Sequence, residues 1–327
     1  MIKLLIGGSP CTHWSVAQNK NRETTSSGIG WELFVNYLIA KERFKPDYFL
    51  YENNKSAATA IKQQIGKELD VEIMHINSAL LSAQNRERFY AFNWAVDIPK
   101  DKKIFLKDVV ITPNGAEPTA VNLQVVGRKR NENGVFERSW EARIDRKAST
   151  ITSIESRRMV AIPITTPSYG RNIYEIKDGL ITVKGKQYPI KLADGFYKIR
   201  PLTVEECCEL QTLPKNYCKS VTKTQAYKGL ANGWTAEIII HILSAALANV
   251  NKNEKIVVLS MYDGIGTGRY CLDKMGFTNV EYYAIEIDAP AKKVANDNYP
   301  DIIQCGDAFQ MRDNTFNING LLSEVRL

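Results

Sequence analysis

A cysteine, a glutamate and two arginines occupy positions from which they could act together on one substrate. Cys11 follows Pro10, directly after an apolar run that predicts a buried strand. Glu52 ends a second apolar run, and Arg86 and Arg88, two positions apart, would face the same side of a strand. A thiolate is a nucleophile, and carboxylate and guanidinium groups stabilise charge that develops during a reaction. Taken singly, such a cysteine is more often a buried apolar residue, and two such arginines are more often a surface ion-pair feature.

A glycine-rich turn near the C-terminus predicts a nucleotide site. It joins the apolar run 255–260 to a helical pattern, where glycines allow a ligand to approach the backbone closely. The spacing is neither GxGxxG nor the GK[ST] ending of a P-loop, so a dinucleotide is not the first expectation. The turn reads Tyr262, Asp263, Gly264, Ile265, Gly266, Thr267 and Gly268.

Two acidic residues at later strand ends complete the predicted nucleotide site. Glu286 lies 22 residues after Gly264 and is followed by Ile287. An acid there can accept hydrogen bonds from both ribose hydroxyls. Asp307, followed by Ala308, ends a third strand and could accept a hydrogen bond from an adenine amino group. Each acid alone more often caps a helix, but together with the turn they favour an adenosine-containing ligand.

The elements that must position these residues alternate between strand and helix patterns. Strands are predicted at 2–6, 47–51, 71–76, 88–94, 255–260, 281–286 and 302–304, and helices at 30–43, 56–69, 235–248, 267–275 and 289–298. This alternation predicts a parallel sheet covered by helices. The region 98–198 lacks a helical period and reads as a smaller, irregular, β-rich domain, after which Thr203 and Glu206 fit a capping box.

Composition and charge narrow the function classes. The 327 residues suggest about two domains, and 44% hydrophobic and 24% charged residues are typical of a globular protein. No apolar run reaches the ~18 residues of a membrane span, and neither a signal-peptide pattern nor a CxxC pair is present, so we expect a cytoplasmic protein without a structural metal.

A basic segment predicts a polyanionic partner. The net charge is +7, and the stretch from Val126 to Val160 holds nine basic and five acidic residues. Such clustering fits nucleic acid, although it also fits an ordinary solvated surface. The predicted nucleic-acid-binding residues are Arg128, Lys129, Arg130, Arg157 and Arg158.

Taken together, these motifs resemble those of the DNA (cytosine-5) methyltransferase family. The resemblance covers nearly the whole chain except about 98–199, and the strings GGSPC and SMYDGIGTG are especially similar to eukaryotic de novo methyltransferases. The matching positions are Pro10-Cys11, Glu52-Asn53, the QxRxR residues Gln84, Arg86 and Arg88, the late-motif residues Arg200, Leu202, Thr203, Glu206, Leu210, Gln211 and Pro214, Asn232-Gly233, and the turn 262–268.

The motif order departs from the family, because the methyl-donor turn comes last instead of first. The sequence therefore resembles a circular permutant, and we expect its two termini to lie close together. The fold class implied is α/β: a Rossmann-like, circularly permuted S-adenosylmethionine-dependent methyltransferase sheet with a smaller irregular β-rich target-recognition domain. The expected division is 1–97 for the catalytic half, 98–225 for target recognition and 226–327 for the donor-binding half.

The resemblance implies transfer of a methyl group from S-adenosylmethionine to C5 of a flipped-out cytosine in double-stranded DNA. By resemblance, Cys11 forms the covalent adduct, Glu52 holds the base edge, and Arg86 contacts the O2 side with support from Arg88. The loop 12–27 would close over the base. The residues expected around the donor are Pro10, Asn232, Trp234, Tyr262, Asp263, Gly264, Ile265, Gly266, Thr267, Glu286, Ile287, Asp307 and Ala308.

Other functions are also compatible with these residues. An RNA cytosine-5 methyltransferase of the transfer-RNA type has a similar catalytic half, and a non-catalytic regulatory relative would share the fold. A small-molecule methyltransferase would not need the set formed by Cys11, Glu52 and Arg86. A prokaryotic or phage origin and association with the nucleoid are expected, whereas the recognised sequence, a restriction-enzyme partner and the oligomeric state are not readable from the chain.

Overall fold

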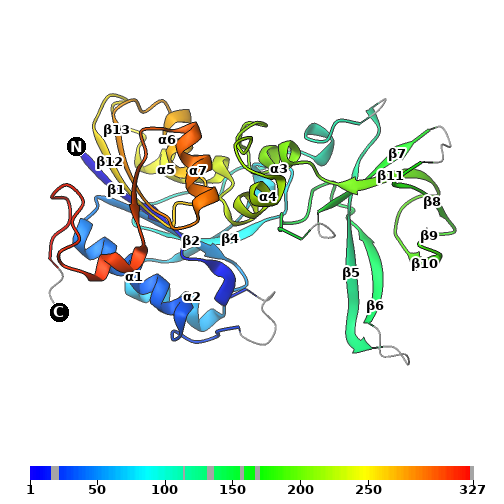
Figure 1. Cartoon of the computed structure of the whole chain (residues 1–327), viewed down its shortest axis with the longest axis horizontal. Coiled ribbons are helices and arrows are strands. Elements are labelled where there is room, and N and C mark those ends of the chain that lie inside the picture. The colour runs from blue at the N-terminus through cyan, green and yellow to red at the C-terminus, as the bar shows by residue number, and fades with distance from the viewer. Residues whose placement is uncertain (16–21, 113–114, 131–135, 155–157, 166–169, 325–327) are drawn as a thin grey trace.

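Two β-sheets lie side by side in the computed structural model of the chain (Figure 1). The structure describes residues 1–15, 22–112, 115–130, 136–154, 158–165 and 170–324. The larger sheet is covered by helices and is built from both ends of the sequence. The smaller sheet comes from the middle of the sequence and projects to one side, with the β5–β6 hairpin extending from it.

The larger sheet has seven strands in the order β14-β13-β12-β1-β2-β4-β3. Its strands are β1 (Ile2–Gly7), β2 (Tyr48–Asn54), β3 (Ile73–Asn77), β4 (Glu87–Phe92), β12 (Ile256–Met261), β13 (Val280–Ile285) and β14 (Ile303–Gly306). β1 pairs in parallel with both β2 and β12, so the first and last parts of the chain meet at the centre of the sheet.

Residues that alternate along each strand bury the two faces of this sheet separately. Leu4 and Ile6 belong to one hydrophobic cluster, whereas Leu5 belongs to another. The first cluster includes residues of α3 (Val204–Leu210), α4 (Lys223–Asn232), α5 (Ala236–Ala246), α6 (Thr267–Lys274) and α7 (Ala289–Asn298). The second includes residues of α1 (Ile29–Phe44), α2 (Thr59–Leu69) and the C-terminal segment. The sheet is thus a three-layer α/β structure, as the alternating patterns predict.

The expectation of an all-parallel sheet is wrong at one strand. β4 pairs antiparallel with both β2 and β3. Only residues 78–86 connect β3 to β4, and a parallel crossover needs about a dozen residues or more. The predicted strands and helices are otherwise found with small shifts at their ends. The capping box at Thr203 is confirmed, since Glu206 N donates to Thr203 Oγ1 and Thr203 N donates to Glu206 Oε2.

The smaller sheet is antiparallel and more regular than the sequence suggests. Its order is β10-β9-β8-β11-β7-β5-β6. The strands are β5 (Thr119–Arg130), β6 (Phe136–Ala142), β7 (Met159–Ile164), β8 (Ile173–Lys177), β9 (Leu180–Val183), β10 (Lys186–Pro189) and β11 (Gly195–Pro201). It has its own hydrophobic cluster, centred on Val121, Ala161 and Ile199. The β-rich content of this region is therefore confirmed.

The chain around the smaller sheet packs with the larger one. Leu106 and Leu210 belong to the cluster of the large sheet, although both lie inside the range 98–225 expected for target recognition. Lys147 connects the two regions, because its Nζ donates to the carbonyl oxygens of Ala79, Ser82 and Ile104. The exact division at 97 and 225 stays a prediction.

Both ends of the described chain approach the C-terminal end of α1. Lys3 Nζ donates to the Phe44 carbonyl oxygen at 3.0 Å, and Ser323 N donates to the neighbouring Arg43 carbonyl oxygen at 2.9 Å. Residues 325–327 lie outside the described part. Within that part, no helix is long and apolar enough to cross a membrane.

Candidate active site

Two glycines bring the Pro-Cys turn against its neighbouring strands. A Cβ atom on Gly7 would lie 2.4 Å from the Met261 carbonyl oxygen, and one on Gly8 would lie 2.5 Å from the Glu52 carbonyl oxygen. Only residues without a Cβ allow backbones to approach this closely. The chain then turns into the short 3-10 helix Cys11–His13, where Cys11 is half-buried.

Replacing Gly8 with alanine is expected to lower the free energy of unfolding by about 1–3 kcal/mol. The new methyl group would overlap the Glu52 carbonyl oxygen, a backbone atom that cannot move aside as a side chain can. The end of β2, which carries Glu52, must shift, so donor-dependent activity should fall as well. Thermal unfolding and methyl transfer measure the two effects. Gly170→Ala is the control, since its Cβ would meet only the Ile173 side chain at 3.3 Å; similar losses in both variants would contradict the close-approach argument.

A buried hydrogen-bond network supports the backbone of the Pro-Cys turn. Ser9 Oγ lies 2.7 Å from Tyr51 Oη, and Asn53 Nδ2 donates to the Ser9 carbonyl oxygen at 2.8 Å. Asn54 Nδ2 donates to the Cys11 carbonyl oxygen at 3.3 Å. Sequence reasoning missed Ser9, Tyr51 and Asn54 as supports, and the only available signal was the presence of polar residues inside an otherwise apolar strand.

Glu52 faces two donors from different parts of the chain. Its Oε1 lies 3.0 Å from Arg88 Nε, and its Oε2 accepts a hydrogen bond of 3.0 Å from Trp234 Nε1. The Glu52 residue is only 8% exposed, and a buried carboxylate requires such partners. In the β2–β4 register Asn54 lies opposite Arg88, so Glu52 and Arg88 are diagonal neighbours on one face.

Arg86 is buried beside this pair. Its Nη2 donates to the carbonyl oxygens of Ala231 at 3.0 Å and Gly233 at 2.7 Å, while Nη1 is buried without a hydrogen-bond partner. Burial and, to a smaller extent, the charge of Arg88 lower the pKa of Arg86 to about 9, although Glu52 and Cys11 favour its charged form. The structure therefore brings the four predicted catalytic residues together, and the Nη1 group of Arg86 is a buried donor without a partner.

Glutamine side chains join the separate sequence motifs underneath this site. Gln84 Nε2 donates to Gln211 Oε1 at 3.2 Å, and Gln211 Nε2 donates to the Leu230 carbonyl oxygen at 2.6 Å. Thr235 Oγ1 donates to Gln211 Oε1 at 2.8 Å. Arg200 makes two hydrogen bonds to Glu206, at 2.7 and 2.8 Å. These residues of the motifs are thus structural supports. The buried glutamine pair joins the segment before β4 to the end of α3 and, through the Leu230 carbonyl oxygen, to α4.

The glycine-rich turn follows β12, the neighbour of β1. Tyr262, Gly264 and Gly266 have positive φ angles of 60°, 65° and 78°. A Cβ on Gly264 would meet nothing within 4 Å, so open space lies above the turn at that point. Tyr262 Oη donates to the Leu33 carbonyl oxygen, and Tyr217 Oη donates to the Ile265 carbonyl oxygen, so the turn is held from both sides of the sheet.

Asp263 points under the turn and not toward a ligand. Its Oδ1 accepts hydrogen bonds from Ser260 Oγ at 2.7 Å and Tyr282 Oη at 2.6 Å, and its Oδ2 is buried without a partner. Burial raises the pKa of Asp263 to about 6, although these two hydrogen bonds lower it. Ile265 and Thr267 are buried as well. The side chains of these three predicted donor-site residues therefore support the turn from below.

Glu286 and Asp307 lie at the ends of adjacent strands, as predicted. Glu286 accepts hydrogen bonds from the backbone N–H groups of Gly264, Ile287 and Asp288. A carboxylate has about four acceptor positions, so Glu286 can accept one more hydrogen bond in this conformation. Asp307 is exposed and accepts a hydrogen bond from Phe309 N at 3.0 Å. Negative charge on Asp307 and Glu286 adds to burial in raising the pKa of Tyr262.

Apolar surface is available beside these acids. Ile287 is 69% exposed and Phe309 is 39% exposed, which is unusual for large apolar side chains. Ala308, in contrast, is buried. Phe309 was missed by sequence reasoning, although an aromatic residue two positions after Asp307 was a usable signal. Asn232, at the end of α4, and Pro10 are both exposed.

The predicted nucleic-acid-binding residues fall into two groups. Arg128, Lys129 and Arg130 lie on β5, where the structure describes the backbone alone, and Arg157 lies outside the described residues. Arg158 is 7% exposed, and its guanidinium carbon lies 3.4 Å from the centre of the Tyr227 ring. Its position at the joint between the two sheets makes Arg158 a packing residue, which corrects its expected place on an exposed basic surface.

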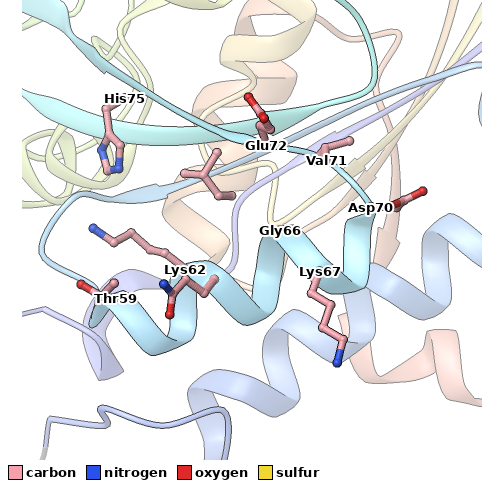
Figure 2. Close-up of a pocket in the computed structure, with 10 residues that line it drawn as sticks. Thr59, Lys62, Gly66, Lys67, Asp70, Val71, Glu72 and His75 are labelled. Carbon is pink, nitrogen blue, oxygen red and sulfur yellow. The ribbon is translucent and has the colours of Figure 1, made fainter.

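One groove lies away from these residues. It has a volume of about 780 Å³ and runs between α2 and the edge strand β3. Figure 2 shows Lys62 on α2 and His75 on β3 facing the same open space. Of the predicted lid 12–27, residues 16–21 lie outside the described part. Among the described residues, no group of three or more histidine, cysteine or acidic side chains could hold a metal ion.

Comparisons with known proteins agree with the motifs. Part of the chain is 30% identical over 112 residues to the orphan methyltransferase M.SPRI of Bacillus phage SPR, covering 31% of this chain and 24% of that protein. It is 31% identical over 107 residues to the orphan methyltransferase M.Rho11sI of Bacillus phage rho11s, covering 29% and 20%. The matched segments thus span a quarter or less of these relatives.

A solved structure described as a prophage-encoded DNA modification methyltransferase of E. coli has a TM-score of 0.39 and 13% identity, covering 75% of this chain and 78% of that one. The sequence profile of the family described as C-5 cytosine-specific DNA methylase matches residues 1–247, which is most of the chain. On this match, and with the four motif residues gathered beside the glycine-rich turn, the chain belongs to the C-5 cytosine-specific DNA methylase family.

Proposed function

We propose that the protein transfers a methyl group from S-adenosylmethionine to C5 of cytosine in double-stranded DNA. The observation that carries this proposal is the arrangement of β1 and β12. Gly7 and Met261 are register partners on these parallel strands, so the turn bearing Cys11 and the glycine-rich turn leave the sheet next to each other. On the other side of β1 lies β2, which carries Glu52, and next to it β4, with Arg86 just before its first residue and Arg88 within it.

Cys11 starts the reaction, because cytosine C5 is a poor nucleophile until a thiolate adds to C6. As the Sγ–C6 bond forms, the electrons of the C5–C6 double bond become available at C5. Glu52 holds the N3 and amino edge of the base, and Arg86 Nη1, buried and unpartnered, is the donor available for O2. After C5 has gained the methyl group, a general base accepts the C5 proton. The electrons of the C5–H bond restore the C5–C6 double bond, and the Sγ–C6 bond breaks to release the Cys11 thiolate.

The donor site fits an adenosine-containing ligand. Open space lies above Gly264, one acceptor position remains on Glu286, and the exposed apolar residues Ile287 and Phe309 flank the exposed carboxylate of Asp307. When bound, S-adenosylmethionine supplies an electrophilic methyl group. The residues proposed to hold it are those of the turn 262–267 through their backbone, with Glu286, Ile287 and Asp307 through their side chains.

The target base must leave the duplex to reach a half-buried cysteine, and such enzymes flip the base out at a cost of a few kcal/mol. We therefore assign the smaller sheet and its basic β5–β6 hairpin to DNA binding and target recognition. The smaller sheet lies beside the large sheet (Figure 1), and Lys147 Nζ donates to the Ser82 carbonyl oxygen, which lies shortly before β4. This arrangement supports the assignment.

Transfer of a labelled methyl group tests the proposed function directly. Purified protein and labelled S-adenosylmethionine are incubated with mixed-sequence duplex DNA or with RNA of matched sequence, and the label is located by nucleoside analysis. Label in 5-methylcytosine of DNA supports the proposal. Label in RNA alone would favour the RNA methyltransferase, and donor binding without transfer to either polymer would favour a regulatory relative.

The basic hairpin gives a prediction about salt. Replacing Arg128, Lys129 and Arg130 together with alanine is expected to weaken DNA binding and reduce the slope of log K against log [salt] by about 0.9 for each phosphate that the variant no longer binds. Titrations at several salt concentrations measure this slope. Alanine at the exposed Lys184, Lys186 and Lys191 is the matched control; an equal change in both triple variants would reject a specific role for the β5–β6 hairpin.

We also propose that the chain is a circular permutant of the usual family order. The central pairing of β1 with β12 and the approach of Lys3 and Ser323 to the end of α1 support this. A chain in which residues 255–327 precede residue 1, joined through a short Gly/Ser linker, is expected to fold and bind the donor as well as the native order does. A reordered chain that folds but loses donor binding would contradict the permutation.

A further inference from the structure

One long-range hydrogen bond joins the two halves of the site. Trp234 Nε1 donates to Glu52 Oε2 at 3.0 Å, across a sequence separation of 182 residues. The carboxylate is held on its other oxygen by Arg88 Nε at 3.0 Å. Two donors on two different oxygens fix the plane of a carboxylate, whereas a single donor leaves it free to rotate about the last side-chain bond.

The backbone that carries Trp234 is itself fixed. The Gly233 carbonyl oxygen accepts hydrogen bonds from Arg86 Nη2 at 2.7 Å and Gln211 Nε2 at 3.2 Å. Thr235 is buried and donates to Gln211 Oε1. The indole therefore leaves a segment held on both sides of it, so the direction of its N–H group is determined by the surrounding network.

The same segment contacts the donor turn. A Cβ on Gly229 would lie 2.7 Å from Ile265 Cγ2, and one on Gly233 would lie 3.5 Å from Ile265 Cδ1. Ile265 belongs to the glycine-rich turn, and its carbonyl oxygen accepts a hydrogen bond from Tyr217. A displacement of the turn would thus move Ile265 against the end of α4, and this would in turn shift Trp234.

We propose that Trp234 is a positioning residue that orients the Glu52 carboxylate toward the target base and links this orientation to the donor turn. The proposal rests on the proposed function, since it assigns the base edge to Glu52. The indole N–H is a donor without acceptor capacity, so it holds Glu52 without exchanging a proton with it. Two of about four acceptor positions on the carboxylate are then used, and two remain for the base.

Trp234→Phe is the informative variant, because it keeps an aromatic ring in the same place and removes only the N–H donor. We expect the rate of a single turnover at saturating donor and DNA to fall by about 10–100-fold, the effect of losing one hydrogen bond to a charged group. Because the variant keeps the aromatic ring that is expected near the donor, the dissociation constant for S-adenosylmethionine, measured by calorimetry, is expected to change by less than about threefold.

Trp94→Phe is the matched control. Trp94 is also partly buried and makes one hydrogen bond, from Nε1 to the Ile242 carbonyl oxygen at 2.9 Å, but it lies at the other end of β4. Its turnover rate is expected to stay near that of the native protein. Should either variant melt earlier than the native protein, all rates are compared at a temperature below every transition, where the folded fractions are equal.

A third measurement separates orientation of the base from the later steps. DNA containing 5-fluorocytosine traps the Cys11 adduct, because the fluorine on C5 cannot leave as a proton does. Slower trapping by Trp234→Phe than by Trp94→Phe is expected if Glu52 is misoriented when the thiolate attacks. Equal trapping rates, or a donor affinity that falls by the same factor as the turnover rate, would overturn the proposal. Absence of any transfer by the native protein would instead contradict the proposed function, before the variants are compared.

Discussion

Replacing Cys11 with serine is expected to lower the rate of methyl transfer to DNA by about 10⁴-fold or more, the range found when a covalent nucleophile is removed from an enzyme. A serine hydroxyl is far less acidic than a thiol and would not add to C6 at neutral pH. The turn itself should be preserved, because the Cys11 contacts that hold it run through its backbone carbonyl oxygen. Donor affinity and thermal unfolding should therefore stay near the native values.

Cys305→Ser is the control for this result. Cys11 and Cys305 are the two half-buried cysteines, whereas the other four are buried. Cys305 lies on the edge strand β14, and its Sγ donates to the Ile303 carbonyl oxygen at 3.4 Å. Normal transfer by Cys305→Ser with no transfer by Cys11→Ser would tie activity to one thiol. Substantial transfer by Cys11→Ser would refute the covalent mechanism.

Replacing Arg43 with methionine is expected to lower the free energy of unfolding by about 3–5 kcal/mol. A loss of this size is typical when one partner of a buried, charged interaction is removed. Arg43 is 1% exposed and donates to four carbonyl oxygens of the C-terminal segment. These belong to Met311, Asp313, Phe316 and Ser323. Methionine fills much of the space but donates no hydrogen bond, so several buried acceptors would lose their partner.

Denaturant unfolding measures this loss, and limited proteolysis shows whether the C-terminal segment opens first. Glu32→Gln is the control, because it removes the charge of the exposed Arg312–Glu32 ion pair, which joins the same segment to α1, and leaves the hydrogen bond from Arg312 to Asn36 in place. An exposed ion pair contributes about 0–1 kcal/mol. Equal destabilisation by the two variants would mean that burial of Arg43 is not what holds the segment.

Features governed by neighbours in the chain were predictable. The capping box at Thr203 needs only residues three apart, and the donor turn needs glycines at positions where φ is positive. The strands and helices of the large sheet follow from apolar periodicity, with ends shifted by a few residues. The grouping of Cys11, Glu52, Arg86 and Arg88 into one site, in contrast, came from the resemblance to the family, because these residues are far apart in the chain.

Only the tertiary structure decided what depends on distant parts of the chain. The direction of β4, the burial of Arg158 against Tyr227 and the downward position of Asp263 all result from packing between elements that local patterns do not relate. Trp234 and Glu52 are 182 residues apart, and Arg43 binds carbonyl oxygens about 270–280 residues away. The sequence by itself thus determined which residues could do the chemistry and which local elements carry them. Folding decided which of these side chains are open to a ligand and which hold the backbone of the site in place. The reason is that burial and long-range hydrogen bonds exist only once strands from both ends of the chain have paired in one sheet.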